Sequence, residues 1–118
     1  MAVLLLSLLA AGKASASTPE SGHGIASVPP AGWTSWNTAG CRRLTQGYIA
    51  DTIEALATSP LLELGFNRVG IDDCWQTCGA GVNGSFHSRD GAPLINHTEF
   101  PDMRALVQRG RAKNIDVG

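Results

Sequence analysis

The chain has 118 residues, of which 43% are hydrophobic, and a formal net charge of −1. This length corresponds to about one small domain, and the apolar content suffices for a folded core rather than a disordered tail. A net charge this close to zero argues against binding to nucleic acid or to an anionic membrane surface.

The first residues have the features of a targeting segment. Residues 2–10, AVLLLSLLA, form an apolar run that is far too short to span a bilayer, and small residues follow at Ala14 and Ala16. This pattern predicts a signal peptide over residues 1–16, with a buried N-terminal helix as the alternative. The polar, proline-bearing residues 17–27 predict an extended lead-in. We therefore expect a protein without a membrane-spanning part that is secreted, or that reaches a vacuole or lysosome through the secretory pathway.

The next segments alternate between strand and helix patterns. Residues 32–37, GWTSWN, predict a first strand. Thr45 is a candidate N-cap for a helix that runs to about Ser59, because apolar residues then recur at helical spacing. Beyond Pro60 we expect three leucines to continue the apolar face up to Gly65: Leu61, Leu62 and Leu64. Residues 66–71 predict a second strand.

The second half of the chain begins with a long polar loop over residues 76–99, rich in glycine, asparagine and serine. Residues 101–114 predict another helix, with Pro101 in its first turn, Asp102 at its positive end and Asn114 as a left-handed C-cap. The cations near its end, in RGRAK, suit the negative end of the helix dipole. The last residues, 115–118, predict the start of a third strand.

The order of these elements defines the predicted fold class. Strands that alternate with helices favour an α/β fold with a parallel sheet and helices outside it. A closed β/α barrel takes roughly 250 residues, so two and a half units cannot complete one. We expect residues 28–118 to be the N-terminal portion of a (β/α)8 TIM barrel, with a small module held by disulfides as the alternative.

Two adjacent carboxylates follow the second predicted strand, in VGIDDCW. In α/β barrels, chemistry lies at the carboxyl ends of the strands, where Asp72 and Asp73 are expected together with Trp36. Ionised carboxylates accept hydrogen bonds from hydroxyl groups, and an indole ring offers an apolar face to the C–H groups of a sugar. This combination favours a carbohydrate over a phosphate, which the carboxylates would repel.

The same residues allow other interpretations. The aspartates could be the acid and nucleophile of a glycosidase, although neighbours on a strand point to opposite sides. They could belong to a calcium site, which needs more oxygen ligands, or could be solvated at a turn. A zinc site would draw on four loop residues without a recognised spacing: Cys74, Cys78, His87 and His97.

Cysteines and sequons agree with secretion. The three cysteines are an odd number, so at least one of them lacks a partner within the chain. Asn83 and Asn96 each begin an N-glycosylation sequon, and both lie in the polar loop.

Three sequence blocks resemble one family of glycoside hydrolases. PPAGWTSWNTAGC, GFNRVGIDDCW and FPDMRALV occur in the order and at the spacing of the α-galactosidase (melibiase) family. The resemblance implies a β/α barrel that hydrolyses terminal α-linked galactose with retention of configuration and without a cofactor or metal. By position, Trp36 corresponds to a galactose contact, and Asp72 and Asp73 correspond to the acceptors of the 4- and 6-hydroxyls.

The resemblance has further implications for the cysteines and the chemistry. Cys41 and Cys74 correspond to a disulfide. The position of Cys78 in the loop after the second predicted strand separately suggests a partner beyond the third strand, after Gly118. The catalytic carboxylates of the family lie on later strands, so we expect residues 1–118 to be inactive alone. The expected function is that of an α-galactosidase acting on an α-galactoside, in an oligomeric state that the sequence leaves open. Alternatives are an α-N-acetylgalactosaminidase or a non-catalytic, secreted sugar-binding protein.

Two positions depart from the common family pattern. Ala31 stands where methionine is frequent and Thr34 where asparagine is frequent. Both lie near the sugar-facing strand, where we expect them to alter packing modestly.

Overall fold

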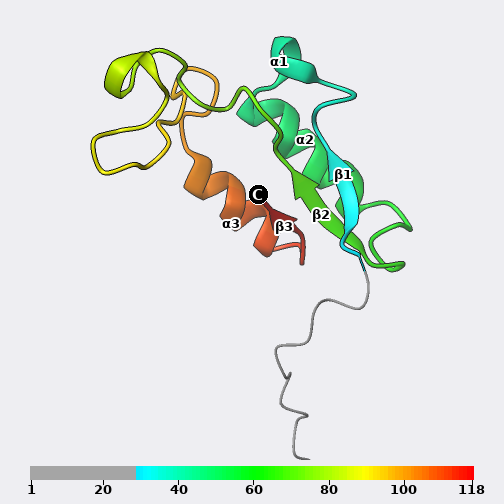
Figure 1. Cartoon of the computed structure of the whole chain (residues 1–118). Helices are drawn as coiled ribbons and strands as arrows, with labels where there is room; N and C mark the ends of the chain where they lie inside the picture. The colour runs from blue at the N-terminus through cyan, green and yellow to red at the C-terminus, as the bar shows by residue number, and fades with distance from the viewer. Residues whose placement is uncertain (1–28) are drawn as a thin grey trace, which may run out of the picture.

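The computed structural model describes residues 29–118, which form a parallel three-stranded sheet with helices (Figure 1). The predicted signal peptide, 1–16, and the lead-in, 17–27, lie outside the described residues. The strands are β1 (Ala31–Thr34), β2 (Phe66–Gly70) and β3 (Asp116–Val117), in the order β1-β2-β3, and both pairs are parallel. The helices are α1 (Gly40–Arg43), α2 (Gln46–Ala57) and α3 (Met103–Arg111), with a 3-10 turn, η1 (Val82–Gly84). The predicted parallel sheet with helices is confirmed.

Helix α2 begins at the predicted cap. The Thr45 hydroxyl oxygen accepts the Tyr48 N–H at 3.1 Å, which satisfies one of the amides that a helix start leaves unpaired. Ile49 and Ile53 lie one turn apart on the buried face and are fully shielded from solvent. Each such side chain contributes about 1.5–3 kcal/mol through removal of its surface from water.

The prediction that the leucines beyond Pro60 extend the apolar face of this helix was wrong for Leu61 and Leu64, whereas Leu62 is partly buried and packs against the core. Helix α2 ends at Ala57, and Leu61 and Leu64 are 44% and 73% exposed. The chain instead closes a separate turn, in which the N–H groups of Gly65 and Phe66 donate to the carbonyls of Leu62 and Leu61. Gly65 has a φ of 89°, a left-handed conformation that glycine adopts without steric cost.

Helix α3 is capped at both ends. The Asp102 carboxylate accepts the Ala105 N–H at 2.8 Å. At the other end Asn114 has a φ of 59°, as predicted, and the following Ile115 N–H returns to the Gly110 carbonyl. Pro101 precedes the cap rather than lying in the first turn, because the Asp102 side chain takes the capping position.

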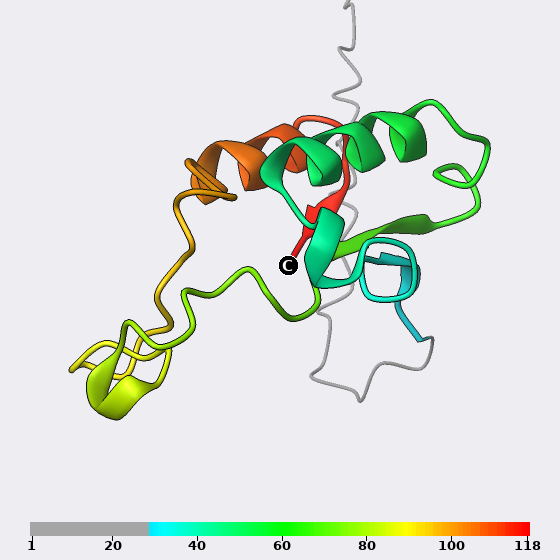
Figure 2. The ribbon, with the colours of Figure 1, turned by 90° about the horizontal axis from the view of Figure 1, so that it is seen from above.

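Helices α2 and α3 lie side by side over one face of the sheet (Figure 2). The core between these layers is apolar and centres on Phe100, Ile49, Ile53, Ile115 and Val69, which are at most 1% exposed. None of the described helices is long and apolar enough to cross a membrane.

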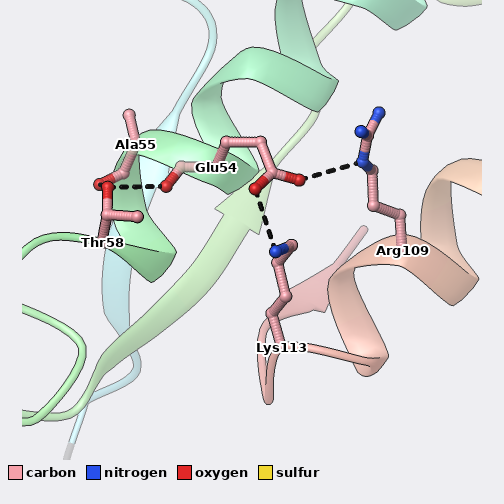
Figure 3. A network of polar contacts seen from close by, with 5 residues as sticks. All are labelled: Glu54, Ala55, Thr58, Arg109 and Lys113. Carbon is pink, nitrogen blue, oxygen red and sulfur yellow. Dashed lines mark hydrogen bonds and ion pairs between the residues drawn. The ribbon is translucent and has the colours of Figure 1, made fainter.

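An ion network joins the two helices at the surface (Figure 3). The Glu54 carboxylate of α2 lies 3.1 Å from the Arg109 guanidinium and 2.9 Å from the Lys113 ammonium. The hydrogen bond from Lys113 and the positive charge of both cations hold the pKa of Glu54 below its usual value. Two of the cations that we assigned to the helix dipole thus also contact a neighbouring helix.

The polar segment over residues 76–99 folds back on itself. Antiparallel bridges pair Gln76 with Ile95 and His87 with Pro93, and the Asn96 N–H donates to the Trp75 carbonyl at 2.9 Å. These contacts close the base of the loop, which projects away from the sheet on the side of the strand ends (Figure 1).

Candidate functional site at the carboxyl ends of the strands

The two predicted site segments meet where β1 and β2 end. Strand β1 ends at Thr34, earlier than the predicted Asn37, and the chain turns at Ser35 because its carbonyl accepts amides from the following turn. The Ser35 N–H donates to the Gly70 carbonyl at 3.1 Å, and the Ser35 hydroxyl oxygen accepts the Asp72 N–H at 2.9 Å. The segment that carries Trp36 is thereby tied to the segment that carries the aspartates.

The two carboxylates share one local arrangement. The Asp72 Oδ1 atom accepts the Asp73 N–H at 2.7 Å, and the Asp73 Oδ1 atom accepts the Cys74 N–H at 2.9 Å. Both residues are exposed, and Cys74 has a φ of 79°, so the chain bends directly after them. Within residues 29–118 neither Oδ2 atom takes part in a hydrogen bond, so each carboxylate keeps one oxygen for an external donor. A solvated turn has these local bonds too, and two acceptors held side by side also suit a polyol.

Trp36 adds an apolar surface to this end of the sheet. Its side chain is 51% exposed, although large aromatic residues are usually much more buried. Its carbonyl accepts the Gly40 N–H at 3.1 Å, which anchors the backbone while leaving the ring accessible. An anchored, exposed indole can pack against the C–H face of a ring-shaped ligand.

A disulfide also links the two segments that form the site. Cys41 of α1 is joined to Cys74, with their Cα atoms 5.3 Å apart, within the usual span of such bonds. This is the pair that the resemblance implied, and it attaches the segment after β1 to the segment after β2. Cys78 is exposed and has no disulfide partner among the described residues.

The disulfide between Cys41 and Cys74 excludes the zinc site suggested by the sequence. A disulfide sulfur is no thiolate ligand, so Cys74 cannot take part in the suggested set. Within residues 29–118 no three His, Cys, Asp or Glu side chains are grouped so that they could hold a metal ion.

The two sequons differ in their surroundings. Asn83 is exposed at η1, whereas Asn96 is half-buried and its side-chain oxygen accepts the Thr98 N–H at 3.1 Å. Both asparagines lie in the loop that projects from the sheet, away from the aspartates in the sequence.

Ser35 is the residue that the sequence did not single out. It is 1% exposed and is the one buried polar residue among those described. Its position in GWTSWN, within the first predicted strand, was the available signal. A serine there also suits a solvated turn, so its burial was not predictable from the residue type.

Comparisons with known proteins give a consistent result. No model of a protein family matches the chain. α-Galactosidase 3 of Arabidopsis thaliana is 43% identical over 98 residues, which cover 81% of this chain and 20% of the relative. Among solved structures, α-galactosidase I from Mortierella vinacea has a TM-score of 0.65 at 33% identity, covering 76% of this chain and 21% of that one. The α-galactosidase from Saccharomyces cerevisiae with raffinose has a TM-score of 0.64 over 76% of this chain and 18% of that one, but at 23% identity it shows the fold alone.

The fold and the site together define the class of protein. The chain is an α/β unit whose strand ends carry paired acceptor groups, and it spans about a fifth of the length of the curated relatives that it matches. Its similarity in sequence and in fold is to α-galactosidases, so the resemblance predicted from the motifs is confirmed.

Proposed function

We propose that the chain is the N-terminal part of an α-galactosidase that removes terminal, non-reducing α-linked galactose with retention of configuration. The observation that carries the proposal is the pair Asp72 and Asp73. Each offers one unoccupied carboxylate oxygen at the strand ends of a chain similar to α-galactosidases. In this proposal the pair accepts hydrogen bonds from sugar hydroxyls, and the Trp36 ring packs on the sugar.

The proposed fold of the whole protein is a (β/α)8 barrel. The parallel sheet supports it, since an open sheet of three strands leaves surfaces that further units would cover. One of these surfaces is an apolar cavity of about 320 Å³ between β2, β3, α3 and the loop, lined by residues such as Ile71, Trp75 and Val107. Further β/α units would bury this surface and place their own strand ends beside Asp72.

The bond cleavage itself requires groups that residues 29–118 do not bring together. Retaining glycosidases use two carboxyl groups about 5–5.5 Å apart across the scissile bond, one as nucleophile and one as acid and then base. Asp72 and Asp73 instead both turn toward the backbone of the next residue through one oxygen. We therefore assign them to sugar binding and the cleavage to carboxylates of later strands, so that residues 1–118 alone are inactive.

We also propose delivery through the secretory pathway. The disulfide between Cys41 and Cys74 supports this, because such bonds persist in oxidising compartments. In that setting Asn83 and Asn96 are the proposed glycosylation sites. The proposed substrates are α-galactosides of the kind that the Saccharomyces cerevisiae structure contains, namely raffinose.

A substrate comparison with the full-length protein tests the function. We expect hydrolysis of p-nitrophenyl α-galactoside and of raffinose, with release of the α-anomer of galactose, as seen by NMR during the first turnovers. Preference for the α-N-acetylgalactosaminide would identify the related enzyme instead. Binding of galactose without hydrolysis would mean a non-catalytic sugar-binding protein, and a lack of both would refute the proposal.

A further inference from the structure

Ser35 holds together the two segments of the candidate site through three sets of hydrogen bonds. Its N–H donates to the carbonyl of Gly70, the last residue of β2, at 3.1 Å, which continues the β1–β2 ladder one residue beyond the end of β1. Its carbonyl accepts three amides of the turn after β1, at 2.8–3.3 Å, from Thr38, Ala39 and Gly40. Its hydroxyl oxygen accepts the Asp72 N–H at 2.9 Å.

The hydroxyl takes over a bond that the backbone of β1 does not make. In a parallel pair each amide facing the neighbouring strand seeks a carbonyl on that strand. The Ser35 carbonyl is already occupied by the turn, so the Asp72 amide is bound by the side-chain oxygen instead. An alanine, valine or other apolar residue at this position would leave that amide without its partner.

The burial of Ser35 separates this role from that of a surface serine. At 1% exposure the hydroxyl is shielded from water, and within residues 29–118 it is bound by the Asp72 amide. The bond links residues that are 37 positions apart in the sequence. Because Trp36 follows Ser35 directly, the same residue sets the position of the indole and of the carboxylate.

We propose that Ser35 is a positioning residue of the sugar site, which holds the Asp72 backbone at a set distance from Trp36 so that the carboxylate and the ring engage one sugar together. The inference rests on the proposed function, since it concerns the same ligand. Ser35 itself does not contact the sugar, because its hydroxyl is buried and directed at the Asp72 amide.

The test uses three variants of the full-length protein. Ser35→Ala removes the acceptor and leaves a smaller side chain. Ser35→Thr keeps the acceptor but adds a methyl group at a buried position. Ser59→Ala is the matched control, since the Ser59 hydroxyl also bonds the backbone, donating to the Leu56 carbonyl at 3.0 Å after helix α2, away from the strand ends. For each, KM and kcat on p-nitrophenyl α-galactoside, inhibition by galactose, hydrogen exchange of the Asp72 amide and the melting temperature are measured.

We expect Ser35→Ala to raise KM and the galactose inhibition constant about fivefold to tenfold, the equivalent of one hydrogen bond. The Asp72 amide should exchange faster in this variant, and Ser59→Ala should leave both readouts unchanged. A packing role predicts the larger loss for Ser35→Thr, because overfilling a buried site is destabilising. A positioning role predicts that Ser35→Thr binds sugar better than Ser35→Ala even with a lower melting temperature.

The outcomes separate this inference from the proposed function. An unaltered protein that neither binds nor hydrolyses α-galactosides would refute the proposed function and the inference with it. An active unaltered protein whose Ser35→Ala variant keeps its KM and its slow Asp72 exchange would overturn the inference alone. If Ser35→Ala does not fold, Ser35→Thr decides: KM and Asp72 exchange that both stay near those of the unaltered protein, or that both rise, support positioning, whereas fast Asp72 exchange with an unchanged KM, or a raised KM with slow exchange, contradicts it.

Discussion

Replacement of the paired aspartates by asparagine is the most direct test of how the site works. In Asp72→Asn the amide oxygen can keep the bond from the Asp73 N–H, which is 2.7 Å long in the structure. The amide nitrogen then takes the position of the outward oxygen, where it presents donors in place of an acceptor. Asp73→Asn has the same consequence, because its Oδ1 atom accepts the Cys74 N–H.

The expected size of the effect follows from this geometry. One charge-assisted hydrogen bond contributes about 1.5–3 kcal/mol, which corresponds to a loss of about tenfold to a hundredfold in galactose affinity. The melting temperature should change little, because the local backbone bond persists and both side chains are exposed. Turnover can fall as well, since binding energy from groups remote from the reacting bond is used in the transition state.

The assay must distinguish a sugar-binding carboxylate from a catalytic one. Full-length variants are measured on a substrate with a good leaving group, with and without azide. Azide can replace a lost nucleophile or general base, but it cannot replace an acceptor of a sugar hydroxyl. Asp51→Asn is the control, because it removes an exposed carboxylate of helix α2 outside the site. Restored activity in Asp72→Asn or Asp73→Asn, with galactosyl azide as product, would show that our assignment of roles is wrong.

Three further predictions concern stability and are measured by unfolding of the full-length protein. Gly110→Ala should cost about 1–3 kcal/mol despite the better helix propensity of alanine, since the new Cβ atom would lie 2.7 Å from the Ile115 carbonyl oxygen; an unchanged unfolding midpoint would contradict this close packing. Glu54→Gln should lower the midpoint at neutral pH and low salt, and the difference should vanish as the pH falls through the lowered pKa of Glu54, where the unaltered carboxyl is protonated too; a difference that grows in acid would refute the ion network. Joint replacement of Cys41 and Cys74 by serine should cost about 3–4 kcal/mol through the freed loop, whereas equal stability under oxidising conditions would mean that the bond does not form.

Local features of the fold were predictable because their causes lie within a few residues. Thr45 and Asp102 cap their helices through amides three positions further on, and Asn114 takes its left-handed conformation through the turn that it closes. The alternation of strand and helix patterns likewise predicted the parallel sheet. Burial of the leucines after Pro60 was not predictable in this way, because an apolar residue does not by itself indicate whether another element of the fold packs against it.

The sequence by itself determined the order of the elements, their caps and the presence of two carboxylates after a strand. Only the tertiary structure decided which residues hold that pair in place. The bond between Ser35 and Asp72 joins positions 37 apart, and the contact between Glu54 and Arg109 joins positions 55 apart. Such contacts depend on the register of β1 against β2 and on the packing of α2 against α3. Neither register nor packing is specified by the residues within one segment, because both arise from the burial of surfaces shared between segments.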